Sequence, residues 1–140
     1  MIRRGGFAEK LFFKLKYRTE HLNYGREIVT HWAIEYASGL NSNDIKLLDI
    51  GLGTGTDLLN IKSNLSDRNV HMFGIETYGP NVEKARQKNG ITVFSMNIET
   101  ESIPVGDEYF DVVVANQIIE HTKEIFWIFG EMHRVLKVGG

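Results

Sequence analysis

The chain has 140 residues, 42% hydrophobic and 24% charged, with a formal net charge of −2, a balance that indicates one globular domain and gives no reason to expect nucleic acid as a partner. The absence of cysteine excludes disulfides, thiolate metal sites and a cysteine nucleophile. No apolar run approaches the ~18 residues of a membrane span, and the N-terminus lacks a signal-peptide pattern, so we expect a cytoplasmic protein with no membrane span.

The first part of the chain, residues 1–44, is predicted to be an N-terminal helical segment on the substrate side of the domain. Residues 1–18 contain six basic side chains and one acidic side chain, and apolar residues recur among them at four-residue spacing. A basic amphipathic helix can bind a membrane or nucleic acid, but we favour a helix packed over the domain or the mouth of its site. The apolar positions are Phe7, Leu11 and Leu15, and the basic positions are Lys10, Lys14 and Arg18.

From residue 23 onward, helical and strand patterns alternate. The first helix is predicted over 23–39, with Ile28, Trp32 and Tyr36 on one apolar stripe and Gly39 at its end. This alternation predicts an α/β fold, a doubly wound and mostly parallel Rossmann-like sheet over residues 45–140 with helices on both faces and strand order 3-2-1-4. The strands are expected at 45–50, 69–76, 91–96 and 109–116, and the further helices at 56–65, 80–90 and 123–137.

The segment LLDIGLGTGTDLL, residues 47–59, places glycines directly after the first strand of this core. In open parallel sheets, ligands bind at the carboxyl ends of the strands. Glycines at such a point indicate that something approaches the backbone closely. We therefore expect Gly51, Leu52, Gly53 and Gly55 to contact a ligand.

Three ligand classes compete for this turn. A nucleoside triphosphate is excluded, because the phosphate-binding lysine is absent and Asp57 would repel phosphates. A dinucleotide is disfavoured, because Thr56 replaces the third small residue and Asp49 would lie near the pyrophosphate. S-adenosylmethionine has no phosphate and carries an ammonium and a sulfonium, so a carboxylate at Asp49 favours it.

The residues Asp49-Ile50-Gly51-Leu52-Gly53-Thr54-Gly55 resemble the first motif of class I S-adenosylmethionine-dependent methyltransferases. The resemblance implies that Glu76, which ends the second strand, accepts hydrogen bonds from the ribose hydroxyls, with Thr77 beside it. It also implies that Asn97 and Ile98 contact the adenine, Asn97 standing where the family usually has Asp. Glu99 is the alternative acid at this point.

Two later segments continue the resemblance. IPVGDEYFDVVVANQIIEH, residues 103–121, is similar to the family's fourth-strand region, and EMHRVLKVGG, residues 131–140, to its next helix and turn. Asn116 and Gln117 are expected to line the pocket, with capping of the next helix as the alternative. Glu120 and His121 could form an acid–base pair, although a hydrogen-bonded histidine at a helix start is the alternative, and no metal site is predicted.

The resemblance implies S-adenosylmethionine as cofactor and in-line methyl transfer to a small-molecule acceptor, with no catalytic residue assigned. A NAD-dependent oxidoreductase and a non-catalytic cofactor-binding module are the alternatives. In the last helix we expect Ile125, Ile128, Phe129 and Met132 to face the sheet, which leaves Phe126 and Trp127 without cover. We also expect the sheet to be truncated after its fourth strand and helix, with self-association through the open edge or through Phe126 and Trp127.

Overall fold

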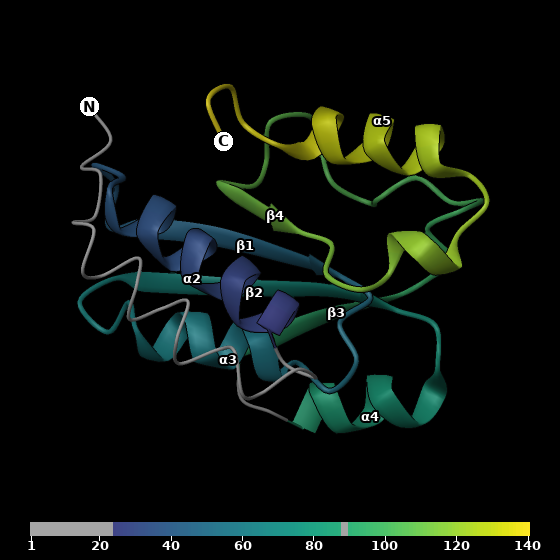
Figure 1. The fold of residues 1–140 in the computed structure, drawn as a ribbon, viewed down its shortest axis with the longest axis horizontal. Coiled ribbons are helices and arrows are strands. Elements are labelled where there is room, and N and C mark those ends of the chain that lie inside the picture. Colours follow the sequence, from purple (N-terminus) through teal and green to yellow (C-terminus); the bar gives the residue numbers. More distant parts are fainter. Residues whose placement is uncertain (1–23, 88–89) are drawn as a thin grey trace.

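The computed structural model describes residues 24–87 and 90–140, which form one parallel sheet covered by helices (Figure 1). The strand order is β3-β2-β1-β4, as predicted, and every pairing is parallel. The basic amphipathic helix predicted before residue 18 lies outside the described residues. The strands are β1 (Asp44–Ile50), β2 (Asn69–Glu76), β3 (Ile91–Ser95) and β4 (Val112–Val114).

Helices cover both faces of the sheet, which confirms the predicted layers. Alanines of α2 share one apolar cluster with residues of α3 and α4. On the opposite face, Ile128 and Val135 of α5 pack with Leu48 and Ile50 of β1. The helices are α2 (Tyr24–Ser38), α3 (Thr56–Ser63), α4 (Gly79–Gln87) and α5 (Ile125–Val135), and the short 3₁₀ helix η1 (Ile119–His121) precedes α5.

Strand β4 is shorter than the predicted span 109–116. Its amino side is held by the chain that follows α5, because Tyr109 and Phe110 both donate backbone hydrogen bonds to the carbonyl of Val135 at 2.8 Å. At its carboxyl side β4 ends at Val114. Three residues later Gln117 adopts a positive φ of 55°, and an extended strand cannot include such a residue. Only the three valines between these points join the β1 ladder.

The predicted apolar stripe of α2 is wrong. Trp32 and Tyr36 are 64% and 39% exposed, whereas Ala33 and Ala37 are buried. Small side chains allow α2 to approach its neighbours closely, and the large aromatic rings remain at the edge of the contact. The Tyr36 hydroxyl instead donates to the carbonyl of Gly139 at 2.5 Å.

The predicted sheet-facing stripe of α5 is correct at Ile128 and Met132 but wrong at Ile125 and Phe129, which are 38% and 50% exposed. The buried face includes Glu131 instead. Its carboxylate accepts the Ile103 backbone N–H at 2.7 Å and guanidinium donors of Arg134 at 2.8 Å. A hydrogen-bonded acid therefore occupies the buried face of α5, where hydrophobicity alone predicts Ile125 and Phe129.

Candidate ligand-binding site

The loop between β1 and α3 turns at three glycines with positive φ. Gly51, Gly53 and Gly55 have φ values of 77°, 54° and 80°, a region that glycine enters without steric cost. The N–H groups of Gly51 and Leu52 both donate to the carbonyl of Ile75, at 3.0 and 2.9 Å. The loop is therefore fastened to the carboxyl end of β2.

The three glycines exclude side chains for different reasons. A Cβ on Gly51 would lie 3.0 Å from Ile118, and one on Gly55 would lie 2.7 Å from Ile91, so protein packing accounts for both. A Cβ on Gly53 would meet nothing within 4 Å. Gly53 is therefore the glycine beside which a ligand could lie.

Leu52 does not present its side chain to this space. It is 5% exposed, and a Cβ on Gly74 of β2 would overlap its side chain. Leu52 thus packs into the core, and any contact with a ligand is left to its backbone.

Glu76 holds the loop from the end of β2. Its carboxylate accepts the N–H of Gly53 at 2.8 Å and those of Thr77 and Tyr78 at 2.9 Å, and the Asn81 side chain lies at 3.4 Å. Asn81 was not predicted from the sequence, although it is a polar residue in the first turn of α4. Glu76 therefore orders the backbone that surrounds the space beside Gly53.

Asp49 lies in the neighbouring strand β1, near its carboxyl end and on the same side of the sheet as Glu76. Its side chain is 3% exposed, and its Cα pairs with Gly74 of β2 and Val114 of β4. Burial of a carboxylate favours a nearby cation or hydrogen-bond donor. The structure therefore places a buried acidic residue near the carboxyl end of β1.

The polar residues after β3 are arranged as a turn. Asn97 is exposed, and its side-chain oxygen accepts the Glu99 N–H at 3.0 Å, while its own N–H donates to Glu101 at 2.7 Å. Ile98 is 7% exposed and belongs to the core beneath α5. The Asn97 amide therefore faces outward while Ile98 anchors the turn.

The polar residues after β4 include an unpaired donor. The side-chain nitrogen of Asn116 is buried and has no hydrogen-bond partner, a state that costs about 1–3 kcal/mol. Gln117 is exposed with a φ of 55°, a strained value for this residue type. Such features are concentrated at binding sites.

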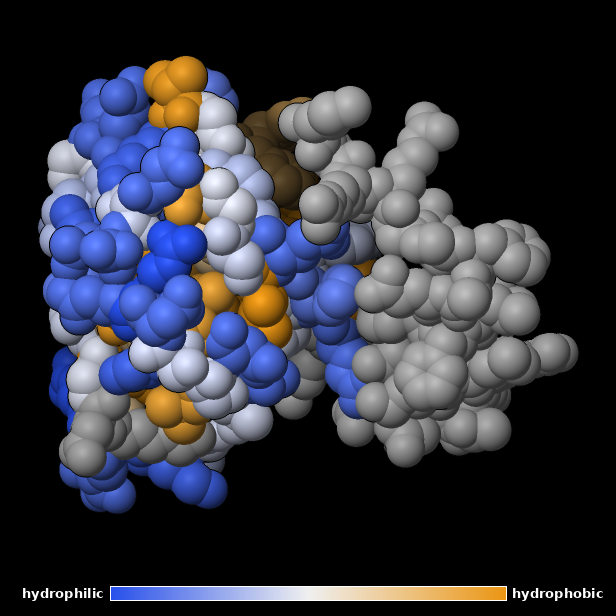
Figure 2. Space-filling view, turned by 90° about the vertical axis from the view of Figure 1, so that its left-hand side faces the viewer, coloured by the Kyte–Doolittle hydropathy of each residue, from blue (hydrophilic) through white to orange (hydrophobic). Residues whose placement is uncertain are grey.

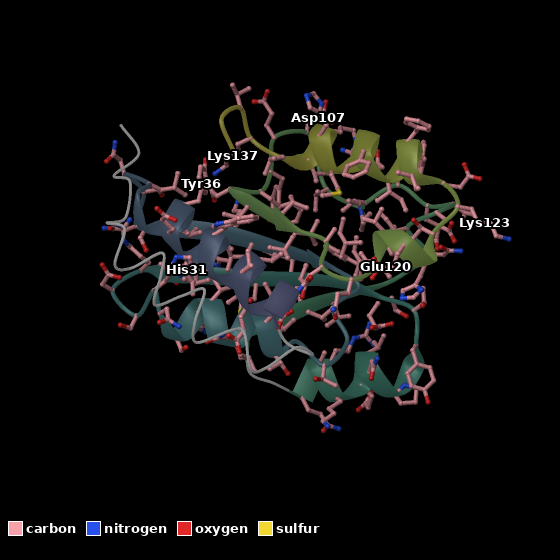
Figure 3. All side chains as sticks on the ribbon, viewed as in Figure 1. His31, Tyr36, Asp107, Glu120, Lys123 and Lys137 are labelled. Carbon is pink, nitrogen blue, oxygen red and sulfur yellow. The ribbon has the colours of Figure 1, made fainter. Side chains whose placement is uncertain are left out.

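Glu120 and His121 are exposed on η1, near the carboxyl edge of the sheet (Figure 3). That edge lies on the right-hand side in Figure 1. The structure brings the ends of all four strands to this side, so the predicted residues share one edge. They are Asp49 within β1 and Gly51, Leu52, Gly53 and Gly55 after it, Glu76 at the end of β2 and Thr77 after it, Asn97 and Ile98 after β3, and Asn116 and Gln117 after β4.

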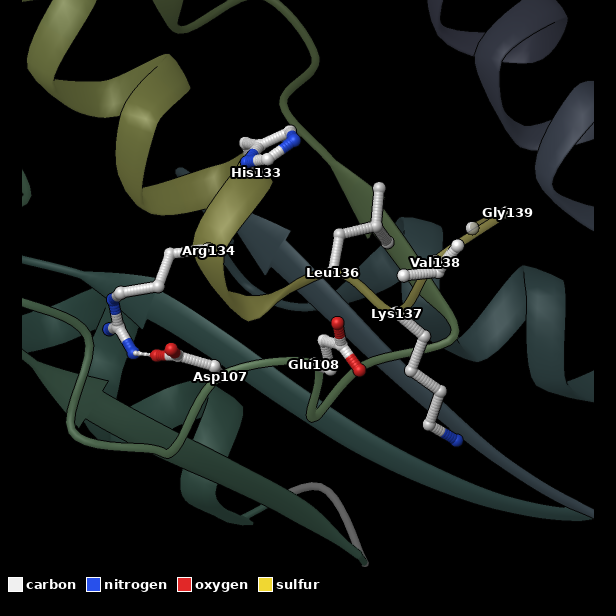
Figure 4. Close-up of a pocket in the computed structure, with 9 residues that line it drawn as sticks. Asp107, Glu108, His133, Arg134, Leu136, Lys137, Val138 and Gly139 are labelled. Atoms are coloured by element: carbon white, nitrogen blue, oxygen red, sulfur yellow. Dashed lines mark hydrogen bonds and ion pairs between the residues drawn. The ribbon is translucent and has the colours of Figure 1, made fainter.

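A cavity of ≈ 490 Å³ lies elsewhere, between the segment before β4 and the residues after α5 (Figure 4). It contains none of the predicted site residues. Arg134 and Asp107 on its wall form an ion pair of 3.1 Å. The face on the left of Figure 1, away from the candidate site, is largely hydrophilic with small hydrophobic areas (Figure 2).

Comparisons with known proteins connect this geometry to one family. Residues 48–140 match the family model described as "Methyltransferase domain". The chain is 32% identical over 120 residues to 2-methyl-6-phytyl-1,4-hydroquinone methyltransferase 1, chloroplastic, of Oryza sativa subsp. japonica, covering 79% of this chain and 35% of that protein. It is 25% identical over 130 residues to a ubiquinone biosynthesis O-methyltransferase of Cereibacter sphaeroides, covering 91% of this chain and 49% of that protein.

A solved structure shares the fold. The crystal structure of a putative S-adenosyl-L-methionine-dependent methyltransferase from Methanococcus maripaludis aligns with a TM-score of 0.65 and 18% identity, covering 100% of this chain and 64% of that one. The chain spans about a third to a half of the length of the curated relatives above. In residues 24–87 and 90–140, no helix has the length and hydrophobicity needed to cross a membrane.

Proposed function

The chain belongs to the family described as "Methyltransferase domain", and from this premise we propose that it is a class I S-adenosylmethionine-dependent enzyme that transfers a methyl group in line to a small-molecule acceptor. One observation carries the proposal. The Glu76 carboxylate holds the glycine loop through the Gly53 N–H at 2.8 Å, and a Cβ on Gly53 would meet no protein atom within 4 Å. The buried Asp49 is the next-to-last residue of the adjacent strand β1.

The residues fit each part of this cofactor. Glu76 can accept hydrogen bonds from ribose hydroxyls in place of its longest contact, the Asn81 side chain at 3.4 Å, and a carboxylate at Asp49 would attract the ammonium group. Asn97 and Ile98 follow β3 and would hold the adenine. Asn116 has a buried donor in need of an acceptor, which supports its predicted place in the pocket beside Gln117.

The chemistry requires positioning more than proton transfer. When bound, S-adenosylmethionine supplies the methyl group and a neutral thioether leaving group. The protein then has to hold the acceptor atom near the methyl carbon and exclude water, an effect worth several orders of magnitude in rate. Glu120 and His121 could remove a proton from an acceptor hydroxyl or amine, since both are exposed near this edge.

The names of the relatives suggest a first panel of acceptors. One is named for a phytyl-hydroquinone and another for ubiquinone biosynthesis. We infer that a phenol or hydroquinone is the acceptor to test first, followed by amines and thiols. We also propose that residues 1–44 lie on the acceptor side of a core at 45–140, and a cytoplasmic location stays a prediction.

Calorimetric titration with S-adenosylmethionine, S-adenosylhomocysteine and NAD tests the proposal. We expect both adenosyl ligands to bind and NAD not to bind, followed by product formation from an acceptor of the panel. Binding of NAD alone would favour the oxidoreductase. Tight adenosyl binding without turnover over the whole panel would favour a non-catalytic module.

A further inference from the structure

Trp127 makes a specific contact that its sequence context did not predict. Its indole N–H donates to the backbone carbonyl of Ile98 at 3.0 Å, although 42% of the residue is exposed. Its neighbour Phe126 is 94% exposed. Trp127 therefore connects α5 to the turn that follows β3.

The contact belongs to a chain of hydrogen bonds through one peptide group. The Ile98 carbonyl accepts from Trp127, and the N–H of the same peptide, which belongs to Glu99, donates to the Asn97 side-chain oxygen at 3.0 Å. Hydrogen bonds in series polarise one another and strengthen. The indole thus acts on the Asn97 amide through a single rigid peptide plane.

A second connection fixes the same turn. One carboxylate oxygen of Glu99 accepts the backbone N–H groups of Lys123 and Glu124, at 2.5 and 3.2 Å. These bonds hold the pKa of Glu99 below its usual range, because they stabilise the ionised form. The turn is therefore attached to the first turn of α5 through Ile98 and to the residues just before α5 through Glu99.

We propose that Trp127 is a positioning residue that fixes the Asn97 amide in one orientation, so that the site selects a 6-amino purine over a 6-oxo purine. This inference rests on the proposed function. With its oxygen held by the Glu99 N–H, the Asn97 amide retains one oxygen lone pair for an amino donor. If the peptide rotates, the amide can turn and offer its NH₂ group to a 6-oxo base equally well.

The experiment compares S-adenosylhomocysteine with S-inosylhomocysteine, which differ in this purine position, by calorimetry on the unaltered protein and on Trp127→Phe. We expect the unaltered protein to prefer the adenosyl ligand. Loss of one orienting hydrogen bond should reduce that preference by about 3–10-fold in Trp127→Phe. Trp32→Phe on α2 is the matched control and should keep the full preference, because Trp32 lies on the other side of the sheet.

The outcomes separate the two proposals. A Trp127→Phe protein that binds with the preference of the unaltered protein overturns this inference and leaves the proposed function intact. Failure of the unaltered protein to bind either ligand overturns both. If Trp127→Phe does not fold, as judged by circular dichroism, Asn97→Ala decides: it should lose the preference, and an unchanged preference overturns the inference.

Discussion

Among single residues, Glu76 combines an observed contact with a proposed one. Its carboxylate accepts the Gly53 N–H of the glycine loop, and we propose that it also binds the ribose. We predict that Glu76→Ala weakens S-adenosylmethionine binding by about 1–3 kcal/mol, because two hydroxyls lose a charged acceptor. Calorimetry measures the change, and Glu76→Gln, which keeps one side-chain oxygen as an acceptor, should lose less. Unchanged affinity in a folded Glu76→Ala protein would show that the ribose lies elsewhere.

Gly53 and Gly51 give a second pair of variants with opposite expectations. We predict that Gly53→Val abolishes measurable cofactor binding, because a β-branched side chain would enter the open space and resist a φ of 54°. Gly51→Ala should mainly lower the free energy of unfolding, because its Cβ would press against Ile118. Titration and urea unfolding of both variants test this division. Normal binding by Gly53→Val would refute the argument from the glycine loop.

The sequence predicted those candidate residues whose position follows from strand ends alone. Asp49 is the next-to-last residue of its predicted strand and Glu76 is the last residue of its own, so a parallel sheet was enough to bring them to the same side. Ile118 against Gly51 and Trp127 against Ile98 were not predictable, because each contact joins segments far apart in the chain. The sequence also did not predict that side chains pack against Gly51 and Gly55 whereas Gly53 has no protein atom in its way.

At the scale of elements, hydrophobic spacing predicted where the helices are but not how they are rotated. Both α2 and α5 occur near their predicted spans, yet α2 buries alanines and α5 buries Glu131. A stripe prediction assumes that the largest apolar residues face the core. It fails where close approach favours small side chains, and where a buried acid is fully paired.

The ion pair between Glu131 and Arg134 connects α5 to a distant segment of the chain. The Arg134 guanidinium donates to Glu131 and to the carbonyls of Ile103 and Val105 at 2.9 Å, so the pair ties the segment before β4 to α5. We predict that Glu131→Ala lowers the free energy of unfolding by about 2–4 kcal/mol, since it leaves Arg134 without its main partner. Urea unfolding measures this, with the exposed Glu124→Ala as control.

The same pair predicts a pH dependence. Hydrogen bonds from Arg134 hold the pKa of Glu131 below its ordinary value of 4.5. A lowered pKa in the folded state stabilises the protein above the unfolded-state value, and this contribution is lost as the pH falls through the folded-state value. We expect the unaltered protein to lose stability on acidification below about pH 4.5, and Glu131→Gln to show a smaller loss. Equal pH profiles would contradict this role for the carboxylate.

At the scale of the whole molecule, the strand order and the two helical layers were predictable because right-handed crossovers leave few topologies. The extent of β4 was not, because its amino side pairs with the chain returning from α5. Leu136 forms a parallel bridge with Phe110, and the Lys137 N–H donates to the Phe110 carbonyl at 2.9 Å. The return of the chain therefore covers one end of β4.

Beyond that bridge, β4 forms an edge of the sheet. Within the described residues, Val112–Val114 pair only with β1, and an uncovered apolar strand offers its backbone to another chain. We predict that the 140-residue chain self-associates through this edge or through the exposed Phe126, and that the amides of Tyr109 and Phe110 exchange slowly while part of Val112–Val114 exchanges fast. Sedimentation over a concentration series, with hydrogen exchange across residues 109–116, tests both parts. Val113→Lys should weaken association without unfolding the protein if the edge strand is responsible, because charge on an edge strand opposes pairing. Phe126→Ser should weaken association instead if α5 is responsible. A monodisperse monomer with slow exchange through all of β4 would mean that the edge is closed by the chain itself.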